Sequence, residues 1–175
     1  MEFTFVHAAD LHLGSPFQGL KVGGAEHRAV AERLREATFA AFSRLVDLCV
    51  ERKASFLLLA GDTFDDEECS VRDVFRFRDG LVRLRDAGIA VFLVHGNHDP
   101  ADGRRPTVAW PENTRIFGAE EAETANIEGL PGVSVTGVSY RTRRESRRLA
   151  RLYRPPDGAG FHIALLHANV GGDRN

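Results

Sequence analysis

The 175-residue sequence is poor in cysteine and has no long apolar run. Its two cysteines, Cys49 and Cys69, are too few for a disulfide framework, and no CxxC motif of a redox or metal site is present. The longest apolar runs, residues 56–60 and 89–94, are far shorter than the roughly 18 residues of a membrane helix. A secretory signal is also missing, since Glu2 stands where such a signal carries positive charge. These absences predict a soluble, cytoplasmic protein with no membrane partner.

Charge is nearly balanced overall but is unevenly distributed along the chain. The net charge is −2, yet residues 141–154 contain seven arginines and one glutamate. An acidic group lies at residues 62–68. One interpretation combines a cation-binding centre with a strip that binds a polyanion, and the alternative is a solvated helix face beside an acidic loop. The hydrophobic fraction of 43% and charged fraction of 27% are typical of a globular domain, which excludes a disordered chain or a rod.

The apolar pattern predicts a single α/β domain over residues 1–175. Strands and helices are expected to alternate in the first part: strand 2–9, helix 26–53, strand 55–60, helix 71–87 and strand 89–94. Such an order implies parallel strands joined by right-handed crossovers. After residue 100 the pattern predicts short β-segments near 115–117, 124–127 and 133–138, a short helix in the arginine-rich segment and a last buried strand, 161–166.

Polar residues with metal-ligand chemistry follow four of the predicted strands. They are Asp10 with His12, Asp62, Asn97 with His98, and His167. Because ligands of open α/β sheets bind at the carboxyl ends of the strands, one edge of the sheet is expected to hold all four groups. Carboxylate, imidazole and amide ligands suit Mn²⁺, Fe²⁺ or Zn²⁺, and the absence of thiolate argues against a structural zinc site.

In this order the motifs resemble those of the calcineurin-like metallophosphoesterases. The segments are Asp10-Leu11-His12, Gly61-Asp62-Thr63-Phe64-Asp65, Gly96-Asn97-His98-Asp99 and Leu166-His167. Within that superfamily, the runs HAADLHLGSPF, REATFAAFSRLVDLCVE, LLLAGDTFD and FLVHGNHDP resemble the SbcD-type DNA repair exonucleases, especially their YhaO-like bacterial branch. The resemblance covers essentially the whole chain. It implies a two-layer β-sandwich flanked by helices, a four-layer α-β-β-α fold.

The resemblance also implies a centre with two divalent ions, Mn²⁺ in the first place and Fe²⁺, Zn²⁺ or Mg²⁺ as alternatives. Asp10 and His12 would hold the first ion, and Asn97 and His167 the second. Asp62 would bridge both ions, because its two oxygens can face different metals. His98 would stabilise or protonate the leaving oxygen, a role that typically contributes about 10²–10⁴-fold.

One family motif is missing from the sequence. The Gly-His-x-His segment expected tens of residues beyond His167 does not occur before Asn175. The chain is therefore expected to be an N-terminal catalytic fragment, incomplete at its C-terminus, in which each ion lacks one imidazole. Weak metal binding, little nuclease activity and an unpaired sheet edge that favours a homodimer are the corresponding expectations for this chain.

The resemblance favours a two-metal DNA nuclease of double-strand-break repair that works with an SbcC-like ATPase subunit. Its expected activity is that of a 3′–5′ exonuclease, with single-strand endonuclease activity in addition. A phosphatase or a cyclic-nucleotide phosphodiesterase would use the same metal core, and a non-catalytic metal-binding or DNA-docking fragment is the third interpretation.

Several further residues have both a functional and a structural interpretation. Asp65 fits a group near the metals or a solvated acidic loop, Asp99 is expected to orient a neighbour, and His95 flanks the site. His7, inside the first strand, is expected to be a buried histidine with its hydrogen bonds satisfied. The candidates for contacts to a DNA backbone are the arginines of the basic segment, which an exposed helix face would equally explain: Arg144, Arg147, Arg148 and Arg151.

Overall fold

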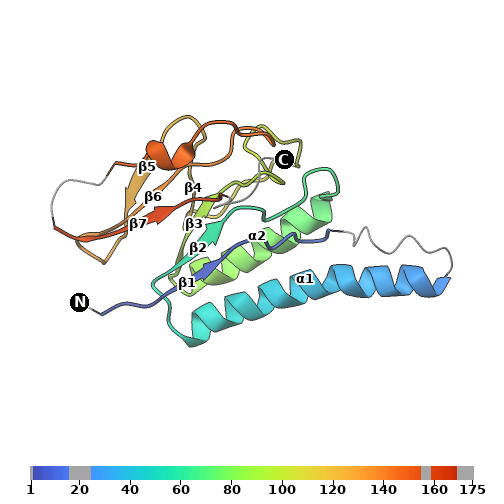
Figure 1. The fold of residues 1–175 in the computed structure, drawn as a ribbon. Coiled ribbons are helices and arrows are strands. Elements are labelled where there is room, and N and C mark those ends of the chain that lie inside the picture. Colours follow the sequence, from blue (N-terminus) through green and yellow to red (C-terminus); the bar gives the residue numbers. More distant parts are fainter. Residues whose placement is uncertain (1, 16–24, 155–158, 169–175) are drawn as a thin grey trace.

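Two β-sheets and two long helices make up the fold (Figure 1). The computed structural model describes residues 2–15, 25–154 and 159–168. The first sheet is parallel, with the order β1-β2-β3-β4, and its strands are Phe5–Ala8, Phe56–Ala60, Ala90–Val94 and Thr114–Ile116. The second sheet has the order β5-β6-β7, with strands Glu123–Asn126, Val133–Gly137 and Phe161–Leu165. The helices are α1, Ala25–Glu51, α2, Val71–Asp86, and the short 3₁₀ helix η1, Leu149–Arg151.

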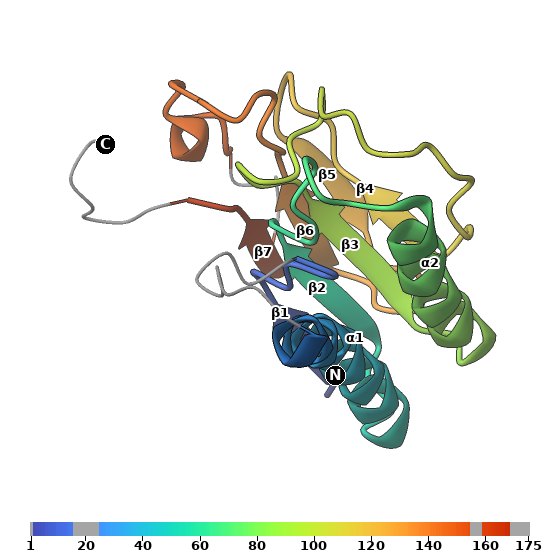
Figure 2. The same cartoon turned by 90° about the vertical axis from the view of Figure 1, so that its right-hand side faces the viewer.

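The first sheet lies between the helices and the second sheet (Figure 2). Successive side chains of a strand point to opposite faces, so β2 buries Leu57 and Leu59 against the helices. The same strand buries Phe56 and Leu58 against the second sheet. A strand covered on both faces needs apolar residues at every position, which explains the continuous apolar runs and confirms the α/β class.

The two long helices are tied to each other by a capping residue and by close packing. Ser70 caps α2 in a capping box with Asp73, and Arg35 of α1 forms an ion pair with the same Asp73 at 2.6 Å. A Cβ at Gly80 would lie 2.4 Å from the ring of Phe42, so the helices cross at a distance that only glycine permits. None of the helices in the described ranges is long and apolar enough to cross a membrane.

Two elements differ from the sequence-based expectation. β7 was predicted to be buried, but Phe161 is 51% exposed and Leu165 alone in this strand is buried, because β7 lies at the edge of the second sheet. The arginine-rich segment was predicted to be a short helix, yet only Leu149–Arg151 is helical, as a 3₁₀ turn. The backbone N–H of Arg147 donates to the Glu145 side chain at 2.9 Å, a local contact that competes with helix formation.

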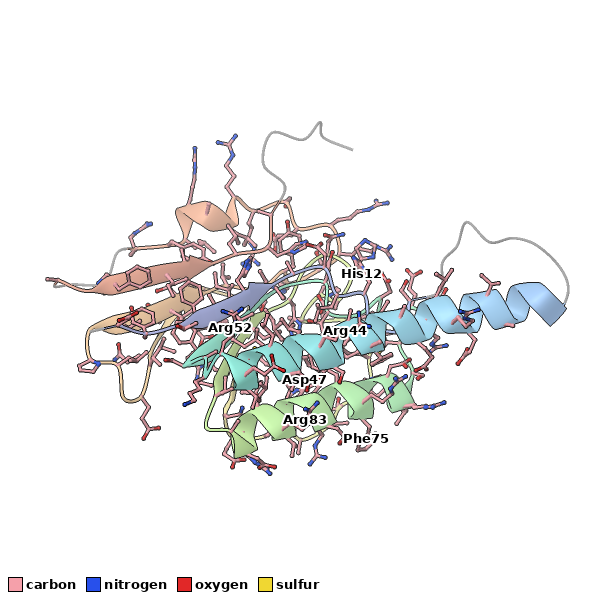
Figure 3. All side chains as sticks on the ribbon, turned by 90° about the horizontal axis from the view of Figure 1, so that it is seen from below. His12, Arg44, Asp47, Arg52, Phe75 and Arg83 are labelled. Carbon is pink, nitrogen blue, oxygen red and sulfur yellow. The ribbon has the colours of Figure 1, made fainter. Side chains whose placement is uncertain are left out.

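Two phenylalanines of α2 are expected to differ sharply in their contribution to stability. Phe77 is buried and packs edge-to-face on Phe64 and Trp110, whereas Phe75 is 46% exposed on the outer side of the helix (Figure 3). Phe77→Ala should lower the free energy of unfolding by about 3–5 kcal/mol through the lost burial and the cavity left behind. Phe75→Ala, the matched control, should change it by less than about 1 kcal/mol. Urea denaturation measures both, and equal losses would contradict the packing described.

Candidate metal centre

The carboxyl ends of β1, β2 and β3 share one edge of the first sheet, where the end of β7 meets them. A cavity of about 480 Å³ lies at this edge. Its lining includes all five predicted metal ligands: Asp10, His12, Asp62, Asn97 and His167. The rest of the lining consists of two further histidines, His7 and His98, and of four apolar residues, Ala9, Ala60, Leu166 and Ala168. The structure therefore brings together every residue to which the sequence analysis assigned metal binding or proton transfer.

His167 reaches this cavity from the second sheet, not from the parallel sheet. Its strand, β7, pairs with β6 in parallel register, so the rule that joins strand ends in one open sheet does not place it. The contact depends on Gly61, which has a φ of +86° and whose Cβ would lie 2.6 Å from His167 Nδ1. His167 Nδ1 also lies 2.9 Å from the carbonyl oxygen of Ala60. When that nitrogen donates, Nε2 is left to face the other ligands.

Three of the predicted ligands adopt a strained backbone. Asp10, His12 and Asp62 have φ values of +55°, +42° and +53°, in the left-handed region that residues other than glycine seldom adopt. Backbone hydrogen bonds hold the two loops together in this conformation, with Asp10 N donating to Gly61 O at 3.1 Å and His12 N donating to Asp62 O at 3.0 Å. Strain of this kind is concentrated at functional sites, because the surrounding structure must fix it.

Asp62 lies at the centre of the cluster. Its Oδ2 is 3.4 Å from His167 Nε2 and 3.9 Å from His12 Nε2, and its Oδ1 accepts the backbone N–H of His98 at 2.9 Å. Burial raises the pKa of Asp62, and the hydrogen bond from His98 offsets only part of this effect. A buried carboxylate between two imidazoles is suited to hold cations on both sides, which agrees with the predicted bridging role.

Two sets of ligand atoms surround this carboxylate. In the first set, the ligand atoms of Asp10, His12 and Asp62 all lie within 4.8 Å of one another. In the second, Asn97 Oδ1 lies 3.1 Å from His167 Nε2, which faces Asp62. The carboxylate, imidazole and amide donors of these sets fit divalent ions such as Mn²⁺. The residues present are therefore chemically suited to hold the two metals that the sequence predicted.

Asp65 binds two imidazoles of the site at once. Its Oδ1 lies 2.5 Å from His98 Nδ1 and its Oδ2 lies 3.1 Å from His12 Nδ1. Burial by itself would raise the pKa of Asp65, but the hydrogen bond from Ser15 and the two imidazoles lower it below its ordinary value. An ionised Asp65 favours the tautomers in which the Nε2 atoms of both histidines are free to face the cavity. Of the two interpretations of Asp65, the geometry favours a group near the metals.

Asp99 connects the loops that follow β2 and β3. Its buried carboxylate accepts backbone N–H groups from Asp62 at 3.0 Å and Gly96 at 2.7 Å through Oδ1, and from Thr63 at 2.9 Å through Oδ2. Asp99 thus orients its neighbours, as the sequence analysis expected. Gly96 packs directly on Asp62, since a Cβ there would lie 2.2 Å from Asp62 Oδ1.

An arginine that the sequence analysis overlooked, Arg105, supports the loops that follow β2 and β3. Arg105 donates to Asp66 at 3.0 Å, to the carbonyl of Asp99 at 2.8 Å and to the ring of His95 at 3.0 Å. Burial raises the pKa of Asp66, and the neighbouring guanidinium of Arg105 opposes that effect. Nothing in the local sequence distinguishes Arg105 from the other arginines, because its partners come from two other segments. His95 therefore flanks the centre as part of a supporting network.

The four arginines proposed as DNA contacts do not share one environment. Arg147 is held by Glu145 at 2.6 Å and by the carbonyl of Ala119 at 2.8 Å. The side-chain hydrogen bond from Arg147 lowers the pKa of Glu145 to about 2. In contrast, Arg144, Arg148 and Arg151 are exposed, and their side chains form no hydrogen bond or ion pair with any described residue. The expectation of four available arginines is therefore corrected to three.

The prediction for His7 is also wrong. The residue is exposed, not buried, and it forms part of the cavity lining. The reason is the position of β1 at the edge of the first sheet, which no local pattern reveals. The alternation of the strand could have indicated that His7 shares a face with Phe5 and Ala9, but not that this face opens into the site.

Comparison with known proteins supports the motif analysis. The calcineurin-like phosphoesterase family matches residues 3–174. The chain is 37% identical over 175 residues to an uncharacterized metallophosphoesterase, YhaO, of Bacillus subtilis, covering 98% of this chain and 42% of that protein. It is 33% identical over 103 residues to the DNA double-strand break repair protein Mre11 of Aeropyrum pernix, covering 59% of this chain and 22% of that protein.

A further relative covers more of the chain at lower identity. The Mre11 protein of Thermoplasma acidophilum is 27% identical over 155 residues, which cover 79% of this chain and 38% of that protein. The chain thus spans less than half the length of each of these relatives.

Replacing the central carboxylate should separate metal binding from folding. Asp62→Asn keeps an oxygen for the His98 N–H but removes the buried charge, whose raised pKa marks it as unfavourable without a cation. We expect the melting temperature in EDTA to stay the same or rise, while the stabilisation by MnCl₂ disappears. Differential scanning calorimetry measures both effects, with surface Asp47→Asn as the control. An undiminished Mn²⁺-dependent stabilisation of Asp62→Asn would contradict the central role of this residue.

Proposed function

The chain belongs to the calcineurin-like phosphoesterase family, and on this basis we propose that it is a Mn²⁺-dependent DNA nuclease that hydrolyses phosphodiesters. The proposed activity is that of a 3′–5′ exonuclease with single-strand endonuclease activity in addition. The observation that carries the proposal is the cavity itself, in which two sets of metal-ligand atoms share the buried Asp62 and His98 lies beside them.

The residues of this chain divide the chemical work among them. Bound divalent ions would polarise the phosphate and activate the attacking water, which is the chemistry that such a pair supplies. One ion would be held by Asp10, His12 and Asp62. The other would be held by Asp62, Asn97 and His167. The hydrogen bond between His167 Nδ1 and the Ala60 carbonyl keeps that imidazole oriented before any ion binds.

In this proposal, His98 delivers a proton to the leaving oxygen. Its Nδ1 is paired with Asp65, so its Nε2 is the nitrogen available to the substrate. A general acid donates its proton from the atom that faces the leaving group, which the contact with Asp65 makes Nε2. His12 lies edge-to-face against His98, with ring centroids 5.0 Å apart, so a metal-binding histidine and the proton donor occupy adjacent positions.

Two observations support DNA over a small phosphoester. The relatives in Aeropyrum pernix and Thermoplasma acidophilum are named DNA double-strand break repair proteins. In this chain, three exposed arginines of one segment, Arg144, Arg148 and Arg151, have side chains without a partner among the described residues. Phosphatases and cyclic-nucleotide phosphodiesterases would use the same metal centre, so the centre alone does not separate the substrates. An SbcC-like ATPase partner, a homodimer and a cytoplasmic location stay predictions that follow from the resemblance.

The proposal is tested by comparing substrates in the presence of MnCl₂. End-labelled single- and double-stranded DNA, cyclic AMP, p-nitrophenyl phosphate and bis(p-nitrophenyl) phosphate are incubated in parallel with the protein. Slow release of mononucleotides from 3′ ends, abolished by EDTA, is the expected result. Hydrolysis of the monoester or of cyclic AMP without cleavage of DNA would replace the proposal by one of the alternative activities.

Substitution of His98 should remove catalysis while leaving metal binding intact. His98→Ala is expected to lower kcat by about 10²–10⁴-fold, the usual contribution of a general acid. Isothermal titration with MnCl₂ should give the stoichiometry of the unmodified protein, because His98 is not assigned as a ligand. A loss of Mn²⁺ binding together with turnover would show that His98 is a ligand.

The three exposed arginines without a partner, and Arg147 with its partner Glu145, offer a controlled test of DNA binding. Replacing Arg144, Arg148 and Arg151 by Gln should flatten the dependence of log K on log salt by about 2–2.7, since each phosphate contact contributes about 0.7–0.9. Arg147→Gln should leave this slope unchanged, because Glu145 already holds that guanidinium. Fluorescence anisotropy with labelled DNA measures the slope. Equal slopes for the triple variant and the unmodified protein would assign the segment to a solvated surface.

A further inference from the structure

The inner face of β1 contains one polar residue among apolar ones. His7 pairs in register with Leu58, which is buried between the two sheets. On the same face, two positions before and after His7, Phe5 stacks on Phe56 and Ala9 packs against the core between the sheets. Packing alone would favour an apolar side chain at position 7, so the imidazole calls for another explanation.

The ring of His7 has no partner among the described residues, unlike the other three histidines of the cavity. His12 and His98 are paired with Asp65, and His167 is bound to the Ala60 carbonyl and to Asn97. No hydrogen bond or ion pair involves the His7 side chain within the described part of the chain, and this side chain is exposed at the cavity wall. Both ring nitrogens are therefore available to a ligand.

His7 flanks the metal ligands but does not belong to their set. Within the described ranges, it is not part of any group of three histidine or acidic residues whose ligand atoms lie within 4.8 Å of one another. It lies within β1, whereas Asp10 follows the end of this strand. Both line the same cavity, so a group that binds next to the metals and extends along β1 would meet His7.

The size and lining of the cavity indicate the chemistry of the substrate group that would extend along β1. Its volume of about 480 Å³ falls within the range of small-molecule sites, about 300–1,000 Å³, and so leaves room for more than a phosphate. Apart from His7 and the polar residues of the centre, the wall consists of Ala9, Ala60, Leu166 and Ala168. Small apolar side chains accept the flat faces of a sugar and a base, while an imidazole hydrogen-bonds to their hydroxyl or edge groups.

The sheet order places β1, which contains His7, and β3, which precedes His98, on opposite sides of β2. Asp62 follows β2, which lies between β1 and β3 in the first sheet. His98 follows β3 and is assigned to the leaving oxygen, so the group on the β1 side is the one that stays on the phosphate. In a 3′–5′ exonuclease this group is the terminal nucleoside, which is released as its 5′-phosphate.

We propose that His7 is a substrate-contacting residue that hydrogen-bonds the nucleoside attached to the scissile phosphate. The inference rests on the proposed phosphodiesterase activity and adds a specificity determinant to it. His7 would distinguish a nucleotide from other phosphodiesters without taking part in the chemical step.

Two substrates with the same leaving group test this inference. Thymidine 5′-(p-nitrophenyl phosphate) and bis(p-nitrophenyl) phosphate both release nitrophenolate, and they differ in the group that stays on phosphorus. His7→Ala should raise KM for the thymidine ester by about threefold to tenfold, the effect of one lost hydrogen bond, and leave KM for the other ester unchanged. His7→Gln, which keeps a donor and an acceptor, should restore part of the affinity. His162→Ala is the matched control, because that ring is bonded to Ser134 at 2.8 Å outside the cavity.

Binding of thymidine 5′-monophosphate with MnCl₂, measured by calorimetry, gives a second readout that does not require turnover. His7→Ala should weaken it by the same factor and leave the binding of inorganic phosphate unchanged. Equal changes for both esters or both ligands, no change for either, or a loss of Mn²⁺ binding would each overturn the inference. If the unmodified protein hydrolysed neither ester, the proposed function would fail, while the two binding measurements would still decide the role of His7.

Discussion

The arrangement of the metal centre depends on the buried carboxylate of Asp99. The loops after β2 and β3 leave the sheet, so their backbone N–H groups lose the partners that the strands provide. Each such buried donor would cost about 1–3 kcal/mol if it stayed unpaired. Asp99 accepts three of them, from Asp62, Thr63 and Gly96, and therefore fixes two loops to each other. Arg105 also connects these two loops, since it donates to the Asp99 carbonyl in one and to Asp66 in the other. As a result, the ligand residues on these loops keep the positions that the order of the parallel strands gives them.

Charge within the centre is arranged before any ion binds. Burial raises the pKa of Asp62, which is the free-energy cost of keeping a carboxylate where cations are needed. In contrast, the effect of burial on the pKa of Asp65 is outweighed by the Ser15 hydroxyl and by the imidazoles of His12 and His98, which together lower this pKa. The first carboxylate is thus left to interact with cations, and the second orients two histidines. Two acids of the same loop, three residues apart, obtain different roles from their surroundings alone.

The cavity has two functional sides because the first sheet flanks Asp62 with a strand on each side. The β3 side supplies His98 and its connection to Asp65, and in our proposal it serves the proton and the leaving group. The β1 side supplies His7 and Ala9, and in our proposal it contacts the group that remains on the phosphate. The exposed arginines of the segment after β6 add positive charge, whose attraction to a polyanion does not depend on sequence or on close fit.

The sequence by itself determined the two long helices, the buried strands β2 and β3 and the motifs at the strand ends. Parallel strands bring their carboxyl ends to one edge, so the convergence of Asp10, Asp62 and Asn97 follows from the order of elements. Tertiary structure decided that the strand before His167 joins the second sheet, that His7 faces an open cavity and that Arg147 is taken up by Glu145. Which strand lies at an edge, and which charge finds a partner, depends on contacts between distant segments. No local pattern encodes those contacts, whereas periodicity and strand-end chemistry are local and can be read directly.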